Sequence, residues 1–261
     1  MALSTLSNIH QNNFTSLISS RVTFSYTGSY TQGTYGVYTY YILTTNGTLD
    51  LSLTGSSKTI NYYLVGGGGS GGFNGAGQLI GGSYKYGLPG NGGNGGQVVT
   101  SSFDITSTNT YSVTIGQGGV ARDFTTVPGD STSLGGISAY GGNGGRGGLN
   151  NQSPSTSTAV NPANVAQTGC ALGGLGTASG TGIAAAGDGT LCPPNGIYYG
   201  GGGGGGGNPG YGAAAGIYGG GFKTNGIANS GGGGGANKTV VQNTNRVKGY
   251  NGGSGLVVIW F

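Results

Sequence analysis

Several short stretches of the chain alternate apolar with polar residues. The segments RVTFSY (21–26), TLDLSL (48–53) and TYSVTI (110–115) each have this period of two, which predicts half-buried β-strands because successive side chains of a strand point to opposite faces. Two other segments, TINYYLV (59–65) and GLVVIWF (255–261), are continuously apolar, as expected of strands covered on both faces. We expect residues 256–261 to pair beside residues 60–65, since these runs are the densest sources of apolar side chains.

A second pattern has a period of three and is made of glycine. Stepping by three from Gly66 to Gly96, nine of eleven positions are glycine, and from Gly201 to Gly219 six of seven are. Three residues per turn is the period of the left-handed extended helix found in polyproline II, which has no internal hydrogen bonds. Glycine along one edge lets neighbouring backbones touch and pair with each other. We therefore predict packed polyglycine helices over residues 66–96 and 200–220, rather than a flexible linker.

Proline–glycine pairs mark where these long runs reverse direction. The segments LPGN (88–91), VPGD (127–130) and NPGY (208–211) each place proline before glycine, as at the two central positions of a type II turn. The predicted fold class is all-β, a small β-sheet or sandwich combined with a packed bundle of polyglycine II helices and almost no α-helix. Residues 36–261 would form this glycine-rich domain, and residues 1–35 an attachment segment or an edge strand.

Composition agrees with an ordered chain of unusual chemistry. Of 261 residues, 66 are glycine, 17 are tyrosine and only 5% are charged. A quarter glycine with so little charge would indicate disorder, but the tyrosines and aliphatic residues supply segments that can be buried. The net charge of +4 comes from nine scattered basic residues, which do not make the continuous stripe that tracks phosphates, so we expect no nucleic-acid partner. No run is long enough for a membrane span.

Two enzyme motifs appear in NYYLVGGGGSGG (61–72). The spacing G-x-G-x-x-G needs a following helix and an acid about 20 residues later to bind a dinucleotide, but glycine and proline follow and position 91 is asparagine. The spacing G-x-S-x-G around Ser70 needs a histidine and a carboxylate, and the chain has one histidine, His10, and no glutamate. We interpret both motifs as products of the composition and expect no enzymatic activity, cofactor or metal.

The two cysteines leave one question open. Cys170 and Cys192 are 22 residues apart, which allows a single disulfide, and two cysteines alone do not fix the redox compartment. We favour free or optionally paired thiols.

The order of motifs from INYYLVGGGGSGG through GGQVVTSSFDITSTNTYSVTIGQGG and GDSTSLGGISAYGGNGG to the closing GGSGLVVIWF resembles a known group. It is similar to the glycine-rich domains of phage tail-fibre tip adhesins and of glycine-rich virion proteins of large DNA viruses, over roughly residues 36–261. The resemblance implies a rigid polyglycine scaffold whose loops bind a host surface. It departs from the adhesins in lacking a separate N-terminal mounting domain, which keeps a capsid, fibre or filament role open.

The resemblance places the binding loops at residues 73–88, 149–168, 193–199, 211–228 and 236–250. These segments combine tyrosine with serine, glycine and asparagine, the chemistry that antibody paratopes use. The aromatic residues expected to make contact are Tyr84, Tyr86, Tyr198, Tyr199, Tyr211, Tyr218 and Phe222. The same residues are equally suited to covering the flanks of glycine helices.

The functional hypothesis is a non-enzymatic virion surface component, adhesin-like or capsid-associated, located on the virion or outside the cell. Its partners would be a host receptor or glycan, or neighbouring subunits in a homo-oligomer. A self-assembling extracellular filament or appendage subunit is the alternative. An ice-binding protein is a third reading, although no register of threonine or alanine marks one face.

Overall fold

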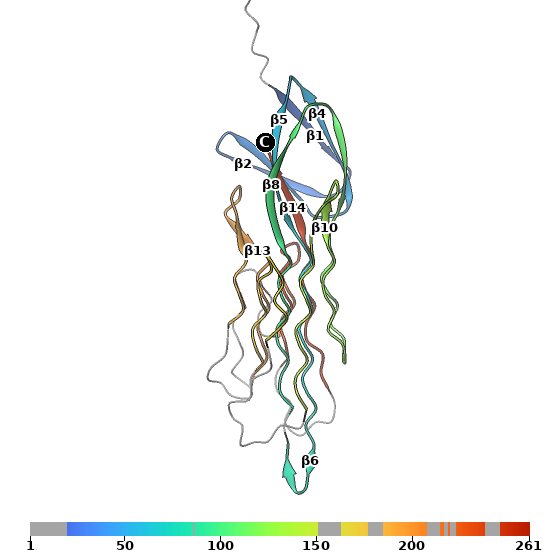
Figure 1. Ribbon diagram of the computed structural model, residues 1–261, viewed down its shortest axis with the longest axis vertical. Coiled ribbons are helices and arrows are strands. Elements are labelled where there is room, and N and C mark those ends of the chain that lie inside the picture. The colour runs from blue at the N-terminus through green and yellow to red at the C-terminus, as the bar shows by residue number, and fades with distance from the viewer. Residues whose placement is uncertain are drawn as a thin grey trace, which may run out of the picture.

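The computed structural model describes residues 20–85, 87–150, 163–176, 185–207, 215–216, 219, 223–237 and 246–261. Two parts follow one another along the long axis, a β-sandwich at one end and a bundle of extended glycine-rich segments that leads away from it (Figure 1). No helix occurs among these residues. The all-β fold with a glycine bundle is therefore confirmed.

The sandwich consists of two five-stranded antiparallel sheets. The first has the order β1 (Arg21–Tyr26), β4 (Gly47–Thr54), β9 (Asn109–Thr114), β10 (Thr132–Leu134) and β11 (Ile137–Ala139). The second has the order β2 (Tyr30–Tyr35), β3 (Tyr38–Leu43), β14 (Leu256–Trp260), β5 (Lys58–Val65) and β8 (Val98–Ile105). Two small hairpins join β6 (Leu79–Ile80) to β7 (Ser83–Tyr84), and β12 (Thr190–Cys192) to β13 (Ile197–Tyr199).

The main core fills the space between the two sheets. The strands predicted from alternation at residues 21–26, 48–53 and 110–115 are β1, β4 and most of β9, and their apolar side chains face inward. The fully buried members of this core come from both sheets: Leu43, Leu49, Leu51, Ile60, Leu64, Ile105, Leu134, Ala139, Val257 and Ile259. β1 and β2, which contain most of the described part of residues 1–35, are edge strands of the two sheets.

The last strand closes the fold as the sequence predicted. β14 lies between β3 and β5, with Leu256 opposite Val65 and Trp260 opposite Asn61. Its side chains are buried on both faces. Val257 and Ile259 enter the main core, while Leu256, Val258 and Trp260 enter a second cluster covered by the β12–β13 hairpin. Burying a large aliphatic side chain contributes about 1.5–3 kcal/mol, so these few residues supply much of the stability.

Six strands of the sandwich are continuous with bundle segments: β5, β8, β9, β10, β11 and β14. The central segment, residues 66–75, leaves β5, and residues 87–97 return to β8. Every third N–H of the central segment donates to the same neighbour: Gly66, Gly69, Gly72 and Gly75 donate to the carbonyls of Gln97, Asn94, Asn91 and Leu88. This regular step of three residues, with no hydrogen bond inside the segment, is that of the three-fold extended helix.

Six described segments surround the central one in a closed ring. Each member of the ring is hydrogen-bonded to the central segment and to the next member, in the order residues 87–97, 140–149, 127–131, 116–121, 246–255 and 231–237. Positive φ among the ring and central glycines occurs only at Gly231, at the start of one segment. The helices are therefore left-handed, and the predicted polyglycine II packing is found in residues 66–75, 87–96 and 201–207. Residues 79–84, which the prediction included, form the β6–β7 hairpin instead.

The need for glycine differs between the centre and the periphery. A Cβ added at Gly66, Gly67 or Gly68 would lie 2.0–2.1 Å from a backbone carbonyl oxygen of three different neighbours, so the central helix requires glycine on all three edges where it leaves the sandwich. Farther along, Ser70, Phe73 and Asn74 occupy two of these edges. In the segment 87–97 one edge in three carries side chains instead, those of Leu88, Asn91, Asn94 and Gln97. The step of three between these side chains thus marks a helix that has one edge free of contact with a neighbouring backbone.

Two of the three predicted turns are wrong. Within LPGN, the N–H groups of Leu88 and Asn91 donate to residues 149 and 146, one step of three apart, so these residues lie inside an extended helix. VPGD is likewise extended, because the carbonyls of Val127 and Asp130 accept from Ser70 and Gly67. Proline fits such a helix since its fixed φ is that of polyproline II. The third, NPGY, lies outside the described residues.

Candidate binding surface

The end of the bundle farthest from the sandwich carries the β6–β7 hairpin (Figure 1). Gly81 and Gly82 have φ values of +57° and +76°, as a two-residue type I′ turn requires. Beside the turn, Leu79 is 57% and Ile80 43% exposed. Two neighbouring aliphatic side chains exposed at a tight turn contribute nothing to the core, so they are available for contact with a partner.

Ser20, directly before β1, lies at the opposite end of the described molecule. Ser20, the first described residue, is packed beside the turn at Gly55 that joins β4 to β5. β5 begins next to this turn and runs to Val65, where the bundle starts. The chain therefore enters the sandwich at the end away from the bundle, and the β6–β7 hairpin lies at the other extreme (Figure 1).

The sequence-predicted aromatic residues fall into three groups. Tyr84 lies in β7, at the far end of the bundle. Tyr198 lies in β13 and is exposed, whereas Tyr199 is only 5% exposed. Tyr199 contacts Tyr63 of β5, with ring centroids 6.0 Å apart, and its hydroxyl accepts a hydrogen bond from Asn195 at 2.8 Å. The interpretation of Tyr199 as a surface contact is therefore corrected to a packing role. The remaining four, Tyr86, Tyr211, Tyr218 and Phe222, lie outside the described residues.

The β12–β13 hairpin is a cover for the outer face of the second sheet. Tyr63 is fully buried beneath it and donates its hydroxyl hydrogen to the carbonyl of Thr190 at 2.6 Å. Burial raises the pKa of the Tyr63 hydroxyl and raises the pKa of the Cys192 thiol to about 12. Cys170 and Cys192 are both free in this structure, and no disulfide links them.

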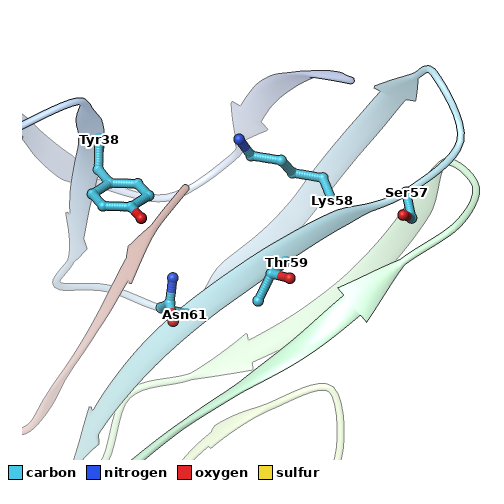
Figure 2. A pocket seen from close by; sticks show the side chains of 5 residues that line it. All are labelled: Tyr38, Ser57, Lys58, Thr59 and Asn61. Carbon is cyan, nitrogen blue, oxygen red and sulfur yellow. The ribbon is translucent and has the colours of Figure 1, made fainter. Parts of the chain in front are cut away.

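Part of the outer face of the second sheet forms a shallow pocket. Figure 2 shows Tyr38 of β3 on one side, with Lys58, Thr59 and Asn61 of β5 and the preceding Ser57 on the other. Thr59 donates to the carboxylate of Asp104 at 2.6 Å, and the Asn61 amide points toward the carbonyl of Trp260. The polar groups at its centre are thus engaged within the sheet, which leaves them little capacity for a ligand.

A second pocket lies on the flank of the bundle. It has a volume of about 340 Å³ and is lined by Asn225, Asn237, Val247, Lys248, Gly249, Tyr250 and Asn251. Close to it, the guanidinium of Arg246 lies 5.3 Å from the ring centroids of both Phe73 and Phe124, a cation–π arrangement that fixes the position of this segment.

Ser70, the serine of the G-x-S-x-G spacing, has a structural role in the bundle. Ser70 is fully buried, and its hydroxyl oxygen accepts a hydrogen bond from the N–H of Val127 at 3.0 Å, so it serves to fill a bundle position. No group of three or more histidine, cysteine, aspartate or glutamate side chains lies together within the part of the chain that the structure describes.

The predicted binding loops at 73–88, 211–228 and 236–250 contain Leu79, Ile80 and most of the pocket residues, but sequence reasoning singled out neither the two aliphatic residues nor the pocket. Leu79 and Ile80 interrupt a glycine run with two apolar residues directly before Gly-Gly, a hairpin signal that was available. The pocket brings together Asn225 and residues 247–251, which are distant in sequence. Their proximity depends on which glycine helices are neighbours, and the residue pattern does not determine the neighbours of a glycine helix.

A family model of glycine-rich domains matches residues 44–261 of the chain. This range begins at the end of β3 and includes every bundle segment. No curated protein matches the chain. None of the described residues forms a helix of the length and apolar character needed to cross a membrane. The chain, with its sandwich and its glycine bundle, belongs to the glycine-rich domain family.

Proposed function

We propose that the chain is a non-enzymatic surface component of a virion, which is mounted through its sandwich and binds a host surface or a partner subunit with the bundle. The observation that carries this proposal is the separation of the two ends. The chain enters at the outer end of the sandwich, beside Gly55, while the β6–β7 hairpin with exposed Leu79 and Ile80 occupies the opposite end.

The internal structure of the bundle supports a role in presentation. The central helix is hydrogen-bonded on all sides, with N···O distances of 2.7–3.0 Å. A loop held by such a scaffold loses little conformational freedom when it binds, which favours affinity. A spacer that only separated two domains would not need a closed ring of hydrogen-bonded backbones.

Binding to cells tests the proposal directly. Fluorescently labelled protein should bind intact cells of a susceptible type, as measured by flow cytometry, and mass spectrometry of purified particles should contain the chain. The double variant Leu79→Ser, Ile80→Ser should bind more weakly, whereas Val120→Ser, at an exposed aliphatic residue elsewhere in the bundle, should not. Absence from particles together with no binding to any cell type would refute the proposal.

A filament subunit is the second candidate, favoured by the edge strand β2. Its residues are almost all exposed, including Tyr30 and Tyr35 at its two ends, and Val37 in the turn after it is exposed as well. Unprotected edge strands pair readily with other chains. Fibrils of the purified protein in negative-stain images, abolished by Thr34→Lys, would favour this candidate, and a monodisperse particle would exclude it.

A further inference from the structure

The backbone that carries the bundle-flank pocket is held by hydrogen bonds on two sides. Its residues 247–251 belong to a segment that is tied to the central helix, because Gly71 donates to the carbonyl of Tyr250 and Gly68 to that of Gly253, both at 2.8 Å. On the other side, Gly226 donates to the carbonyl of Asn251 at 2.8 Å. The positions of the pocket side chains are therefore set by the bundle.

The amide side chains in this pocket are oriented by the backbone. The Oδ1 atom of Asn225 accepts from the N–H of Asn251 at 3.0 Å, and the Oδ1 atom of Asn251 accepts from the N–H of Ala121 at 2.8 Å. Both amide oxygens are thus occupied. Within the described part of the chain, neither of the two NH₂ groups donates a hydrogen bond, so both remain as donors for a ligand.

Two more donors line the same pocket. Lys248 is exposed, and its ammonium group forms no ion pair with any described residue. The hydroxyl of the half-buried Tyr250 has no hydrogen-bond partner among those residues. A pocket that gathers one ammonium, one hydroxyl and two amide NH₂ groups fits a ligand rich in acceptor oxygens, and the ammonium favours one that carries negative charge.

The distribution of charge along the molecule agrees with an anionic ligand. The strands of the two five-stranded sheets carry balanced charges, with Arg21 and Lys58 against Asp50 and Asp104. The rest of the chain contains seven basic and three acidic side chains, all between residues 85 and 248, which accounts for the whole net charge of +4. The glycine-rich part is therefore the positive pole of the chain.

We propose that this pocket binds an acidic sugar, a residue carrying a carboxylate or sulfate. Lys248 pairs with the anionic group, Asn225 and Asn251 donate to hydroxyl and ring oxygens, and Tyr250 offers its hydroxyl and ring. The volume of about 340 Å³ is at the lower end of the range for ligand pockets, which suits a sugar ring. A nucleic acid would need a row of basic residues along its phosphates, and this flank presents a single donor cluster.

This inference rests on the proposed function in that it names a ligand for the same bundle. Its test uses the purified chain and oligosaccharides of defined structure, a glucuronic acid-containing tetrasaccharide, a sulfated one and a neutral one of equal length, with titration calorimetry. The acidic sugars should bind and the neutral one should not. Lys248→Gln should weaken binding roughly tenfold or more, as loss of a charged hydrogen bond does, and Tyr250→Phe should weaken it less.

Arg146 supplies the matched control. It is exposed on the segment 140–149, which lies across the central helix from the segment 246–255 in the ring. Arg146→Gln removes the same charge and should leave the affinity within about twofold, because charges on opposite flanks are screened from each other. Equal loss in both variants, equal binding of the neutral sugar, or tighter binding of DNA would overturn the proposal.

Cell binding separates this inference from the proposed function. If labelled protein binds cells but acidic oligosaccharides do not bind the pocket, the sugar proposal is wrong and the surface role stands. If the sugars bind through Lys248 but neither cells nor particles carry the protein, the pocket stands and the surface role is wrong.

Discussion

Leu256, the first residue of the last strand, lies directly opposite Val65, the last residue before the central glycine helix. The chain therefore returns to the sandwich at the point where it left for the bundle. Since the glycine helices bury little side-chain surface, the free energy that holds the two parts together comes from β14 and the strands beside it.

Ile259→Ala should lower the free energy of unfolding by about 2–5 kcal/mol, the usual cost of removing a large buried aliphatic side chain. Ile259 is fully buried between the sheets, while Ile227, on the bundle surface, is 48% exposed. Ile227→Ala, the control, should cost less than about 0.5 kcal/mol. Denaturant titrations followed by tyrosine fluorescence measure both, and equal losses would contradict the importance of β14.

Gly69→Ala should destabilise the protein by about 1–3 kcal/mol or prevent folding, as overpacking does. A Cβ at Gly69 would lie 2.1 Å from the carbonyl oxygen of Asn143, whereas a Cβ at Gly187 would approach no atom closer than 3.2 Å. Gly187→Ala should therefore be close to neutral. Thermal denaturation of the two variants provides the comparison, and a stable Gly69→Ala protein would show that the bundle is looser than described.

Asn164→Ala should cost about 1–3 kcal/mol for each buried partner left unsatisfied. The Asn164 amide accepts from Asn91 and from the N–H of Arg146, and donates to Asn94 and to the carbonyl of Gly92, at 2.7–3.0 Å. Asn109→Ala is the control, because that amide bonds only to Ser107. Chemical denaturation should show a large loss for the first variant and a small one for the second.

The stability of the protein should fall as the pH rises above about 9. Burial raises the pKa of Cys192 from about 9 to about 12 and that of Cys170 to about 11. Above pH 9 the two thiols lose their protons in the unfolded chain but keep them in the folded chain. The stability that the folded state has relative to the unfolded state is therefore unaffected by these thiols below pH 9, and it falls as the pH approaches 12. The variant Cys192→Ala should show a shallower decline between pH 9 and 11 than the unmodified protein, and an unchanged slope would contradict the assignment.

The sequence predicted the strands and the closure because these depend on side chains. The runs around Tyr63 and Val258 are apolar at successive positions, and only a strand covered on both faces buries all of them. The period of three predicted the glycine helices for a similar reason, because it shows which edges of each helix carry side chains and which do not.

The neighbours of each glycine helix were beyond prediction. A backbone hydrogen bond between two glycines is the same for any pair of segments, so the ring around residues 66–75 is fixed by the order of strands in the two sheets. The bundle-flank pocket depends on that order. The errors at 88–91 and 127–130 have a related cause, because proline followed by glycine is compatible with both a type II turn and an extended helix.

Hydrogen exchange of the glycine amides tests most directly whether the glycine-rich segments form a hydrogen-bonded scaffold. The N–H groups of Gly67, Gly68, Gly69 and Gly71 each donate at 2.8–3.0 Å inside the ring. They should therefore exchange as slowly as those of Val257 and Ile259 in β14, through opening of the whole domain. Amides that exchange within seconds, at the rate of an unstructured glycine linker, would contradict the account.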